Sequence, residues 1–315
     1  MKTDSHKIAV AINLEANGGK ARSKWDHIKN DFSKLCAEEL HITAYKLPFD
    51  IEKYLREIIE KKQIRKLIIG GGDGTINLFI NSLSKIVGLN GLKEYSIGAI
   101  GLGSSNDFFK PISKRIANIP VRISTNESEL VDLGLVKIKK TNGDAIIKLF
   151  AVNAGLGVIA EANHRYNNPD KVISLLKNRV TQLSIIYTAI KTIVSFRNIL
   201  LDLSFDDVHQ SANISNISVT LIPYISGSFH YKTIKPKKGF LDLFICRDMT
   251  KMDLLKTLFK LANGKFPNGK KRIFEQINGL NVSSRKSVPF ETDGEITIGK
   301  GFEFSIKENC ICLMN

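Results

Sequence analysis

The sequence predicts a two-domain protein: an N-terminal doubly wound α/β domain and a C-terminal antiparallel β-sandwich or barrel-like domain. Apolar strand-like runs alternate with helical spacing up to about residue 127, the pattern of a parallel sheet covered on both faces. Beyond that point short strand-like runs separated by turn residues dominate, which is typical of antiparallel β structure. The length of 315 residues agrees with two domains, and we place the boundary between residues 130 and 131.

The first domain is expected to alternate strands with helices. The predicted strands cover residues 7–14, 41–47, 66–70 and 95–103. The predicted helices cover residues 20–40, 50–62 and 75–87. Each helix repeats apolar residues at helical spacing, as Trp25, Ile28 and Phe32 do in the first, so that one face of it packs on the sheet.

The second domain is expected to be mostly strands. The strand-like runs are residues 130–138, 145–155, 198–205, 216–226, 240–247, 280–284, 295–299 and 302–308. Only two helical stretches are expected among them, at about 169–197 and 251–263. Turn residues separate the runs, which favours antiparallel pairing.

The charge of the chain is unusual. A formal net charge of +15 attracts polyanions such as nucleic acid, anionic lipid headgroups or nucleotides, although a lysine-rich soluble surface explains it as well. No nucleic-acid-binding motif or basic–aromatic pattern accompanies the charge, so we expect no nucleic-acid partner. The apolar run near the N-terminus is too short for a signal peptide, and no window is long enough to span a membrane. We therefore expect a soluble, cytoplasmic protein.

The stretch GGGDGT, residues 70–75, follows the third predicted strand and precedes a helix. Ligands of open parallel sheets bind at the carboxyl ends of the strands, where glycines allow close backbone approach. Thr75 is expected to cap the helix, which leaves backbone N–H groups for an anion. For a glycine-rich loop taken alone, a plain tight turn is the stronger interpretation.

Asp73 favours a ligand-binding loop over a plain tight turn. A carboxylate beside phosphates is unfavourable unless a cation lies between them or the carboxylate accepts a proton. Magnesium is held in proteins by one or two carboxylates together with phosphate oxygens and water, so a Mg-nucleotide explains the aspartate. Two further loops, residues 13–21 and 101–109, follow the first and fourth predicted strands. Three such loops at one edge of a sheet favour phosphotransfer.

These motifs resemble the diacylglycerol kinase catalytic-domain family, which includes bacterial lipid kinases and sphingosine kinases. The resemblance rests on GGGDGTINLFINSL, GLGSSNDFF, the NxxxxGGKA element and a late TDGE, and covers nearly the whole chain in order. GGDGT alone also occurs in NAD kinases, whereas its combination with GSSNDF is far more specific. VDLGLV, FAVNAGLG and FLDLF match landmarks of the second domain of the family.

The resemblance implies an ATP- and Mg-dependent lipid kinase with particular site residues. By position, the ATP contacts are Asn13, Gly18, Gly19, Gly71, Gly72, Asp73, Gly74, Thr75, Ser104 and Asn106. Asp73 and Asp107 would hold the magnesium ion. Asp293 and Glu295 join Asp73 as catalytic carboxylates, and which one removes the proton of the lipid hydroxyl stays open. The final strand, within residues 303–315, would return to the first domain, which leaves 131–302 as the lipid-substrate domain.

The chain departs from the pattern of the family at several positions. Leu14 replaces the usual proline of the first loop, and Asn17 stands where glycine is common, although asparagine tolerates the left-handed conformation. Some bacterial members bind a structural magnesium ion through an aspartate where this chain has Lys238. Because lysine cannot ligate magnesium, we expect no structural magnesium there.

The acceptor and the partners are less determined. Diacylglycerol leads among the acceptors, and sphingoid bases, ceramide and other lipid alcohols stay open. The alternatives from other classes are an NAD kinase and a nucleotide-binding sensor without turnover. We expect peripheral association with an anionic membrane through two basic clusters, Lys232, Lys235, Lys237 and Lys238, and Lys265, Lys270, Lys271 and Arg272, with Phe266 and Pro267 entering the interface. An ordinary solvated loop is an equal alternative, and the oligomeric state, including a homodimer, stays open.

Overall fold

The computed structural model describes residues 7–36, 38–225, 227, 229–231 and 235–315. The chain divides into two compact units. Unit 1 comprises residues 1–133 and 308–315, and unit 2 comprises residues 134–307. The sequence-based division lay at residues 130 and 302, a few residues away.

Unit 1 contains a parallel sheet in the order β2-β1-β3-β4. Its strands are β1 (Lys7–Asn13), β2 (Glu39–Tyr45), β3 (Lys66–Gly71) and β4 (Ser96–Gly101). The last residues of β17 (Glu295–Met314) pair in parallel with β4, with Cys312 opposite Ser96. The ribbon β5 (Arg115–Ile116) and β6 (Ile119–Arg122) joins β4 through β6. The carboxyl ends of β1, β3 and β4 therefore meet at one edge.

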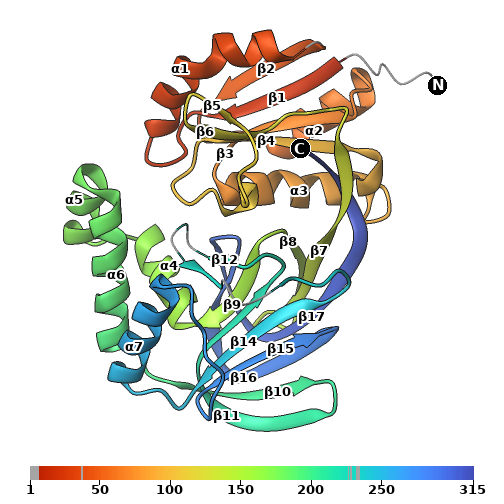
Figure 1. Cartoon of the computed structure of the whole chain (residues 1–315). Helices are drawn as coiled ribbons and strands as arrows, with labels where there is room; N and C mark the ends of the chain where they lie inside the picture. The colour runs from red at the N-terminus through yellow and green to blue at the C-terminus, as the bar shows by residue number, and fades with distance from the viewer. Residues whose placement is uncertain (1–6, 37, 226, 228, 232–234) are drawn as a thin grey trace. The chain divides into compact units, whose positions relative to one another are not determined.

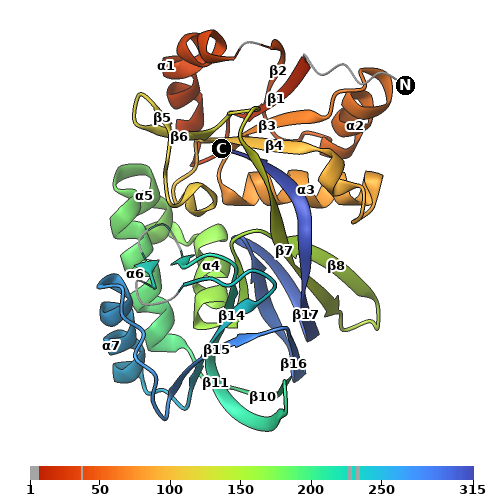
Figure 2. The ribbon, with the colours of Figure 1, turned by 45° about the vertical axis from the view of Figure 1, so that its right-hand side comes forward.

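Helices cover both faces of this sheet (Figures 1 and 2). On one face, Trp25, Ile28 and Phe32 of α1 (Lys20–Leu35) are buried with the apolar residues of β1. On the other face lie α3 (Asp73–Val87) and α2 (Ile51–Arg56), which continues as the π-helical turn η1 (Glu57–Lys61). The remaining elements are the 3₁₀ turns η2 (Leu92–Glu94) and η3 (Asp107–Phe109). The doubly wound α/β fold predicted for this part is confirmed.

Unit 2 is built mainly from antiparallel strands. They are β8 (Ala145–Phe150), β9 (Asn153–Gly157), β10 (Ile199–Phe205), β11 (Val208–Thr220), β14 (Leu241–Arg247), β15 (Arg272–Ile277), β16 (Gly279–Thr292), the first part of β17 and the end of β7 (Ser128–Lys139). A short pair, β12 (Tyr224–Ile225) and β13 (Phe229–His230), lies apart.

Strands β11 and β16 each change partner halfway along. Both pair with β10 at one end and with β9 at the other, so the four strands close on themselves. The closed strands surround an apolar core that includes Leu156, Leu203, Ile217 and Phe290. The barrel-like β domain predicted for the second half is confirmed.

The helices of unit 2 differ from the prediction. The expected helix over 169–197 is two helices, α5 (Lys171–Arg179) and α6 (Thr181–Ser195), because Val180 between them is extended. The helix α7 (Lys251–Ala262) lies where expected. The structure adds α4 (Val158–Asn167), so the prediction of only two helical stretches was wrong.

The start of α4 depends on a residue far away in sequence. Its N-cap is Gly157, which provides no side-chain cap. Instead, the side-chain oxygen of Asn216 on β11 accepts a hydrogen bond from the backbone N–H of Ile159 at 3.0 Å. Because the first N–H groups of a helix need such acceptors, a tertiary contact replaces the local start signal. None of the helices in the described part of the chain is long and apolar enough to cross a membrane.

Candidate functional site

The three predicted loops follow β1, β3 and β4, and hydrogen bonds connect them. Asn13, the last residue of β1, donates its side-chain amide to the Thr75 hydroxyl of α3 at 3.2 Å. Its side-chain oxygen accepts the N–H of Glu15 at 3.0 Å. Asn13 therefore orders the first loop and ties it to the second.

The first loop turns through left-handed backbone conformations. Asn17, Gly18 and Gly19 have φ angles of 55°, 63° and 84°. The expectation that Asn17 tolerates this conformation is confirmed. A Cβ atom added at Gly18 or Gly19 would meet no atom within 4 Å. The two glycines are therefore explained by backbone conformation, and the space above them is open.

The second loop is packed more tightly. A Cβ atom on Gly71 would lie 2.6 Å from Cβ of Thr75, so only glycine fits there. The N-cap of α3 is Gly72, and Asp73 and Gly74 lie in the first turn. Thr75 does not cap the helix, which corrects the prediction, because the extended backbone of Gly72 starts the helix earlier and buries Thr75 within the first turn.

The Asp73 carboxylate holds the third loop. Its two oxygens accept hydrogen bonds from the backbone N–H groups of Asp107 at 3.1 Å and of Phe108 at 3.0 Å. Gly72 and Gly103 also approach so closely that a Cβ atom on Gly103 would lie 2.5 Å from Cα of Gly72. The second and third loops thus form one structure at the edge of the sheet.

The two predicted ATP contacts of the third loop, Ser104 and Asn106, differ in how far they are buried. Ser104 is exposed. Asn106, with a φ angle of 53°, donates to the carbonyl oxygens of Gly101 and Gly103, while its own side-chain oxygen is buried without a hydrogen-bond partner. An unsatisfied buried acceptor is costly unless a ligand or water completes it. Asn106 therefore fits a ligand-binding position.

Asp107 has a strong partner within the protein. Its side chain is only 4% exposed, and one oxygen accepts a hydrogen bond from the ammonium group of Lys110 at 2.7 Å. Magnesium bound with a nucleotide needs only one or two protein carboxylates. Among the described residues no three His, Cys, Asp or Glu side chains gather as a metal-binding group. A magnesium ion at this place would be held by Asp73, with phosphate oxygens and water as its further ligands.

A cavity of about 510 Å³ opens in unit 1 beside the third loop. Its lining includes Lys24 and His27 of α1, Asn106, and Arg115 of β5. The Lys24 ammonium donates to the carbonyl oxygen of Gly103 at 3.0 Å, and burial, aided by the charge of Lys20, lowers its pKa. Sequence analysis missed these basic residues, although Lys20, Lys24 and His27 share one face of α1 by their spacing.

In unit 2 the TDGE segment forms a two-residue hairpin turn. Thr292 of β16 pairs with Glu295 of β17, and between them Asp293 and Gly294 have φ angles of 46° and 86°. Asp-Gly is a preferred sequence for such a turn. The hairpin interpretation of the motif is confirmed, and its chemical role is a separate question.

The Asp293 carboxylate is occupied by the backbone. Its oxygens accept hydrogen bonds from the N–H groups of Ala151 at 2.8 Å, Val152 at 3.0 Å and Asn153 at 2.8 Å. Ala151 and Val152 form the connection between β8 and β9, and Asn153 begins β9, whereas the sequence predicts one continuous strand here. Asp293 therefore fixes that connection.

Glu291 is a buried carboxyl group that sequence analysis missed. It accepts hydrogen bonds from the side-chain amides of Asn153 at 2.8 Å and Asn163 at 2.9 Å, and from the Gly294 N–H at 3.2 Å. Burial, aided by the Asp293 charge, raises the pKa of Glu291 to about 7, although the hydrogen bonds oppose the shift. The ETDGE motif contained this residue, but no local pattern indicated its burial.

Glu295 differs from both of these carboxyl groups. Its side chain is 37% exposed, and one oxygen lies 3.0 Å from the Lys148 ammonium group. Of the three carboxyl groups around the turn, Glu295 is the one that solvent or a ligand reaches.

Of the residues predicted to contact a membrane, the described lysines of the first basic cluster are exposed, but Phe266 is buried. Lys232 lies outside the described residues, whereas Lys235, Lys237 and Lys238 are exposed. Phe266 is only 7% exposed and packs against Tyr231 and Phe244, so the prediction that it enters a membrane interface was wrong. Its aromatic ring completes the core beneath α7.

Comparison with known proteins places the chain in a family. Residues 7–136 match the model of the diacylglycerol kinase catalytic domain. Residues 153–314 match the model of the YegS C-terminal NAD kinase beta sandwich-like domain. The chain belongs to this two-domain family, as the resemblance of its motifs had indicated.

Named relatives agree with this assignment, and a solved structure agrees with the fold. A protein of Staphylococcus aureus strain bovine RF122 / ET3-1, named "Putative lipid kinase", is 28% identical over 291 residues, which cover 90% of this chain and 88% of the relative. A crystal structure titled as a "putative diacylglycerol kinase" from Bacillus anthracis strain Sterne has 20% identity and a TM-score of 0.70, and covers 99% of this chain and 98% of that one. At this identity the structure supports the fold alone.

Proposed function

We propose that this protein is an ATP- and magnesium-dependent lipid kinase, which transfers the γ-phosphoryl group of ATP to the hydroxyl of a lipid alcohol, with diacylglycerol as the first candidate. The observation that carries the proposal is the Asp73 carboxylate, whose hydrogen bonds to the backbone of Asp107 and Phe108 assemble two glycine-rich loops at the edge of a parallel sheet. Membership of the family supports the same reaction.

The loops of unit 1 suit a triphosphate. The open space above Gly18 and Gly19 leaves room for phosphate oxygens, and the N-terminus of α3 provides N–H donors for them. Magnesium, held by Asp73 and the nucleotide, would neutralise charge on the transferred group. Lys24, which donates to the carbonyl oxygen of Gly103, adds a positive charge beside the third loop.

The carboxyl groups of unit 2 suit different tasks. Three N–H donors occupy the oxygens of Asp293, which supports a positioning role for it. Glu295 is accessible, and we assign it the role of general base. The hydroxyl oxygen of the lipid bonds to the γ-phosphorus as the bond from phosphorus to the bridging oxygen breaks. The hydroxyl proton passes to Glu295, and ADP leaves with the bonding electron pair.

The test uses radiolabelled ATP, magnesium and mixed micelles of diacylglycerol, a sphingoid base, ceramide or a monoacylglycerol. Label in the organic phase identifies the acceptor. Asp73→Asn and Glu295→Gln are each expected to lower kcat by about 10²-fold or more. Glu303→Gln, the same change at an exposed residue of β17, is the control and should keep the rate of the original chain.

The free energy of unfolding distinguishes the positioning role of Asp293 from the general-base role of Glu295. Asp293→Asn should lower the free energy of unfolding by about 2 kcal/mol or more, because buried N–H donors lose their acceptor, whereas Glu295→Gln should change it by less than about 0.5 kcal/mol. Full activity of Glu295→Gln would contradict the assignment of the base. Label transferred to NAD instead of any lipid would replace the proposal with an NAD kinase.

A further inference from the structure

Among its described residues, the helix α6 buries three polar side chains and exposes four apolar ones. Ser184, Thr188 and Thr192 recur every four residues and are buried. On other sides of the helix Leu183, Ile186, Ile190 and Val194 are exposed, with Val194 reaching 67%. An ordinary surface helix has the reverse arrangement. Ile193 of α6 is buried in the core cluster that includes Leu254 and Phe266, but core burial does not explain the four exposed apolar residues.

The neighbouring helices also expose apolar side chains. In α5 the exposed apolar residues are Val172 and Leu175, and in α7 they are Met252 and Phe259, the last 71% exposed. Nine of the eighteen exposed large apolar side chains in the described part of the chain lie between residues 172 and 194 or on α7, so the exposure is concentrated. The three helices run along one side of unit 2 in both views (Figures 1 and 2). We call this surface the helical face.

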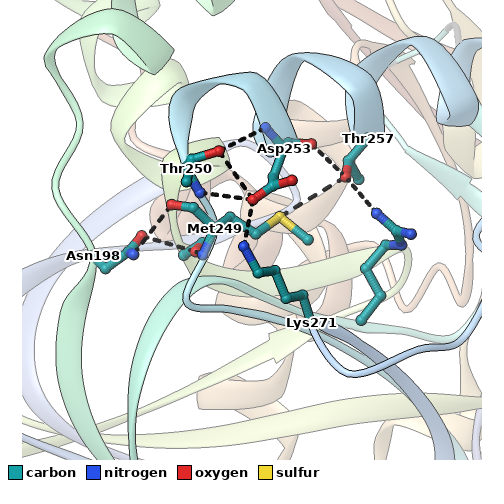
Figure 3. Close-up of polar contacts among 8 residues, drawn as sticks. Asn198, Met249, Thr250, Asp253, Thr257 and Lys271 are labelled. Carbon is teal, nitrogen blue, oxygen red and sulfur yellow. Dashed lines mark hydrogen bonds and ion pairs between the residues drawn. The ribbon is translucent and has the colours of Figure 1, made fainter.

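Hydrogen bonds and an ion pair fix α6 and α7 of the helical face to each other and to the segments nearby. Thr250 and Asp253 form a reciprocal capping box at the start of α7, and Asp253 also pairs with the Lys271 ammonium at 2.6 Å (Figure 3). Lys251 donates to the carbonyl oxygen of Phe196, directly after α6. The Asn198 amide donates to the Met249 carbonyl oxygen at 3.2 Å. These contacts hold the end of α6 against the start of α7.

The charge around the helical face has one sign. Residues 169–197 contain five lysines and arginines and a single acidic residue, Asp170, which pairs with Lys191. Residues 251–272 contain seven lysines and arginines and a single acidic residue, Asp253, which pairs with Lys271. Lys171, Lys256 and Lys260 are exposed. A second copy of this chain would bring the same positive charge and would be repelled.

We propose that the helical face docks on an anionic lipid bilayer, with the apolar side chains of α5, α6 and α7 entering the interface and the lysines contacting lipid phosphates. Apolar residues combined with basic residues and few acids are typical of helices that lie in a membrane interface. The proposal deepens the proposed function and rests on it for its biological purpose. Its test, however, needs neither ATP nor turnover.

The experiment measures partition of the full chain onto sucrose-loaded vesicles, without nucleotide, at low salt. Vesicles of phosphatidylcholine with phosphatidylglycerol are compared with phosphatidylcholine alone. The original chain should prefer the anionic vesicles. The triple variant Leu183→Ser, Ile186→Ser and Ile190→Ser should lower the partition coefficient by about 10-fold or more. Lys256→Gln with Lys260→Gln should lower it by a similar factor on anionic vesicles only.

The matched control changes equally exposed apolar residues elsewhere. Leu35→Ser with Ile147→Ser, each 59% exposed in the original chain, should leave the partition coefficient within about 2-fold. Circular dichroism and thermal melting check that each variant is folded. If the triple variant does not fold, Met252→Ser with Phe259→Ser tests the same face on α7.

Each outcome decides the proposal. Absence of binding by the original chain, or equal binding by the α6 and α7 variants, overturns it. A dimer that dissociates in the triple variant, while vesicle binding stays unchanged, also overturns it and makes the face a self-association surface. Lipid phosphorylation without vesicle binding rejects the docking and keeps the kinase. Vesicle binding that only the helical-face variants lose, in a chain without kinase activity, supports the docking and rejects the proposed function.

Discussion

Asp73 and Asp293 each hold a neighbouring loop through backbone N–H groups, one in each unit. Asp73 accepts two such hydrogen bonds and Asp293 accepts three. Charge-assisted hydrogen bonds of this kind are roughly twice as strong as neutral ones. At the scale of single residues, these aspartates position the loops of the sites, while Glu295 next to Asp293 keeps an accessible carboxylate for the proposed reaction.

Glu291 makes stability depend on pH. Its pKa in the folded protein, about 7, lies above its ordinary value of 4.5. The folded state therefore binds this proton more tightly. The resulting stabilisation is complete below about pH 4.5 and is lost as the pH rises through 7. We expect the free energy of unfolding to fall by about 1–3 kcal/mol across this window.

Glu291→Gln tests this expectation, because glutamine does not titrate. Urea unfolding at several pH values should show a flatter profile for the variant between pH 5 and 8. Glu303→Gln, an exposed glutamate of β17, should keep the slope of the original chain. Equal slopes for the original chain and Glu291→Gln would show that another group is responsible.

At the scale of elements, the second and third glycine loops pack directly against each other. Gly72 at the start of α3 and Gly103 after β4 touch backbone to backbone. The distance leaves no room for a side chain, so the two loops keep their positions together. The N-terminus of α3 is thereby held next to the third loop, as binding of a phosphate chain across both loops requires.

Gly103→Ala should disturb this contact. The added Cβ would lie 2.5 Å from Cα of Gly72 and 2.9 Å from the side-chain oxygen of Asn106, so the loops must separate. We expect a stability loss of about 1–3 kcal/mol and weaker binding of Mg-ATP, by about 10-fold or more in calorimetric titration.

Gly269→Ala is the control for this change, since its Cβ would meet no atom within 4 Å. It should keep both the stability and the nucleotide affinity of the original chain. Unchanged affinity in Gly103→Ala, at unchanged stability, would mean that the contact of the loops does not shape the nucleotide site.

At the scale of the whole molecule, β17 belongs to both units. Its first part pairs with β16 in unit 2, and its last residues pair with β4 in unit 1. The carbonyl oxygen of Asn315 accepts N–H groups of Ile123 at 3.1 Å and Ser124 at 2.7 Å. Cys310, Ile311, Leu313 and Met314 are buried. The end of β17 therefore contributes buried side chains to the core of unit 1.

A chain that ends at Lys307 should destabilise unit 1 selectively. The sole tryptophan, Trp25, lies in the same core cluster as Met314, so its fluorescence reports on unit 1. We expect its thermal transition to fall by about 10 °C or more, since several buried apolar side chains are lost. Met314→Ala should lower it by a smaller amount, in line with a loss of about 2–5 kcal/mol. A Trp25 transition at the original temperature would contradict the expectation.

The sequence by itself determined the fold class, because strand and helix periodicities are local and extend over many residues. It also identified the three loops, since GGGDGT, GLGSSNDFF and the residues after Asn13 combine glycines and polar residues at strand ends. The hairpin at Asp293 and Gly294 was also predictable from local sequence, because the preference of Asp-Gly for a two-residue turn depends on these neighbouring residues alone. The catalytic roles of these residues stay predictions.

Only the tertiary structure decided what depends on residues far apart in sequence. Asn216 starts α4, Phe266 is buried beneath α7, and Asn163 reaches Glu291 across 128 positions. The outward apolar side of α6 is a similar case, because its periodicity predicts an amphipathic helix without saying which side faces the core. Burial and long-range hydrogen bonds arise only when distant segments pack together, and no local pattern encodes them.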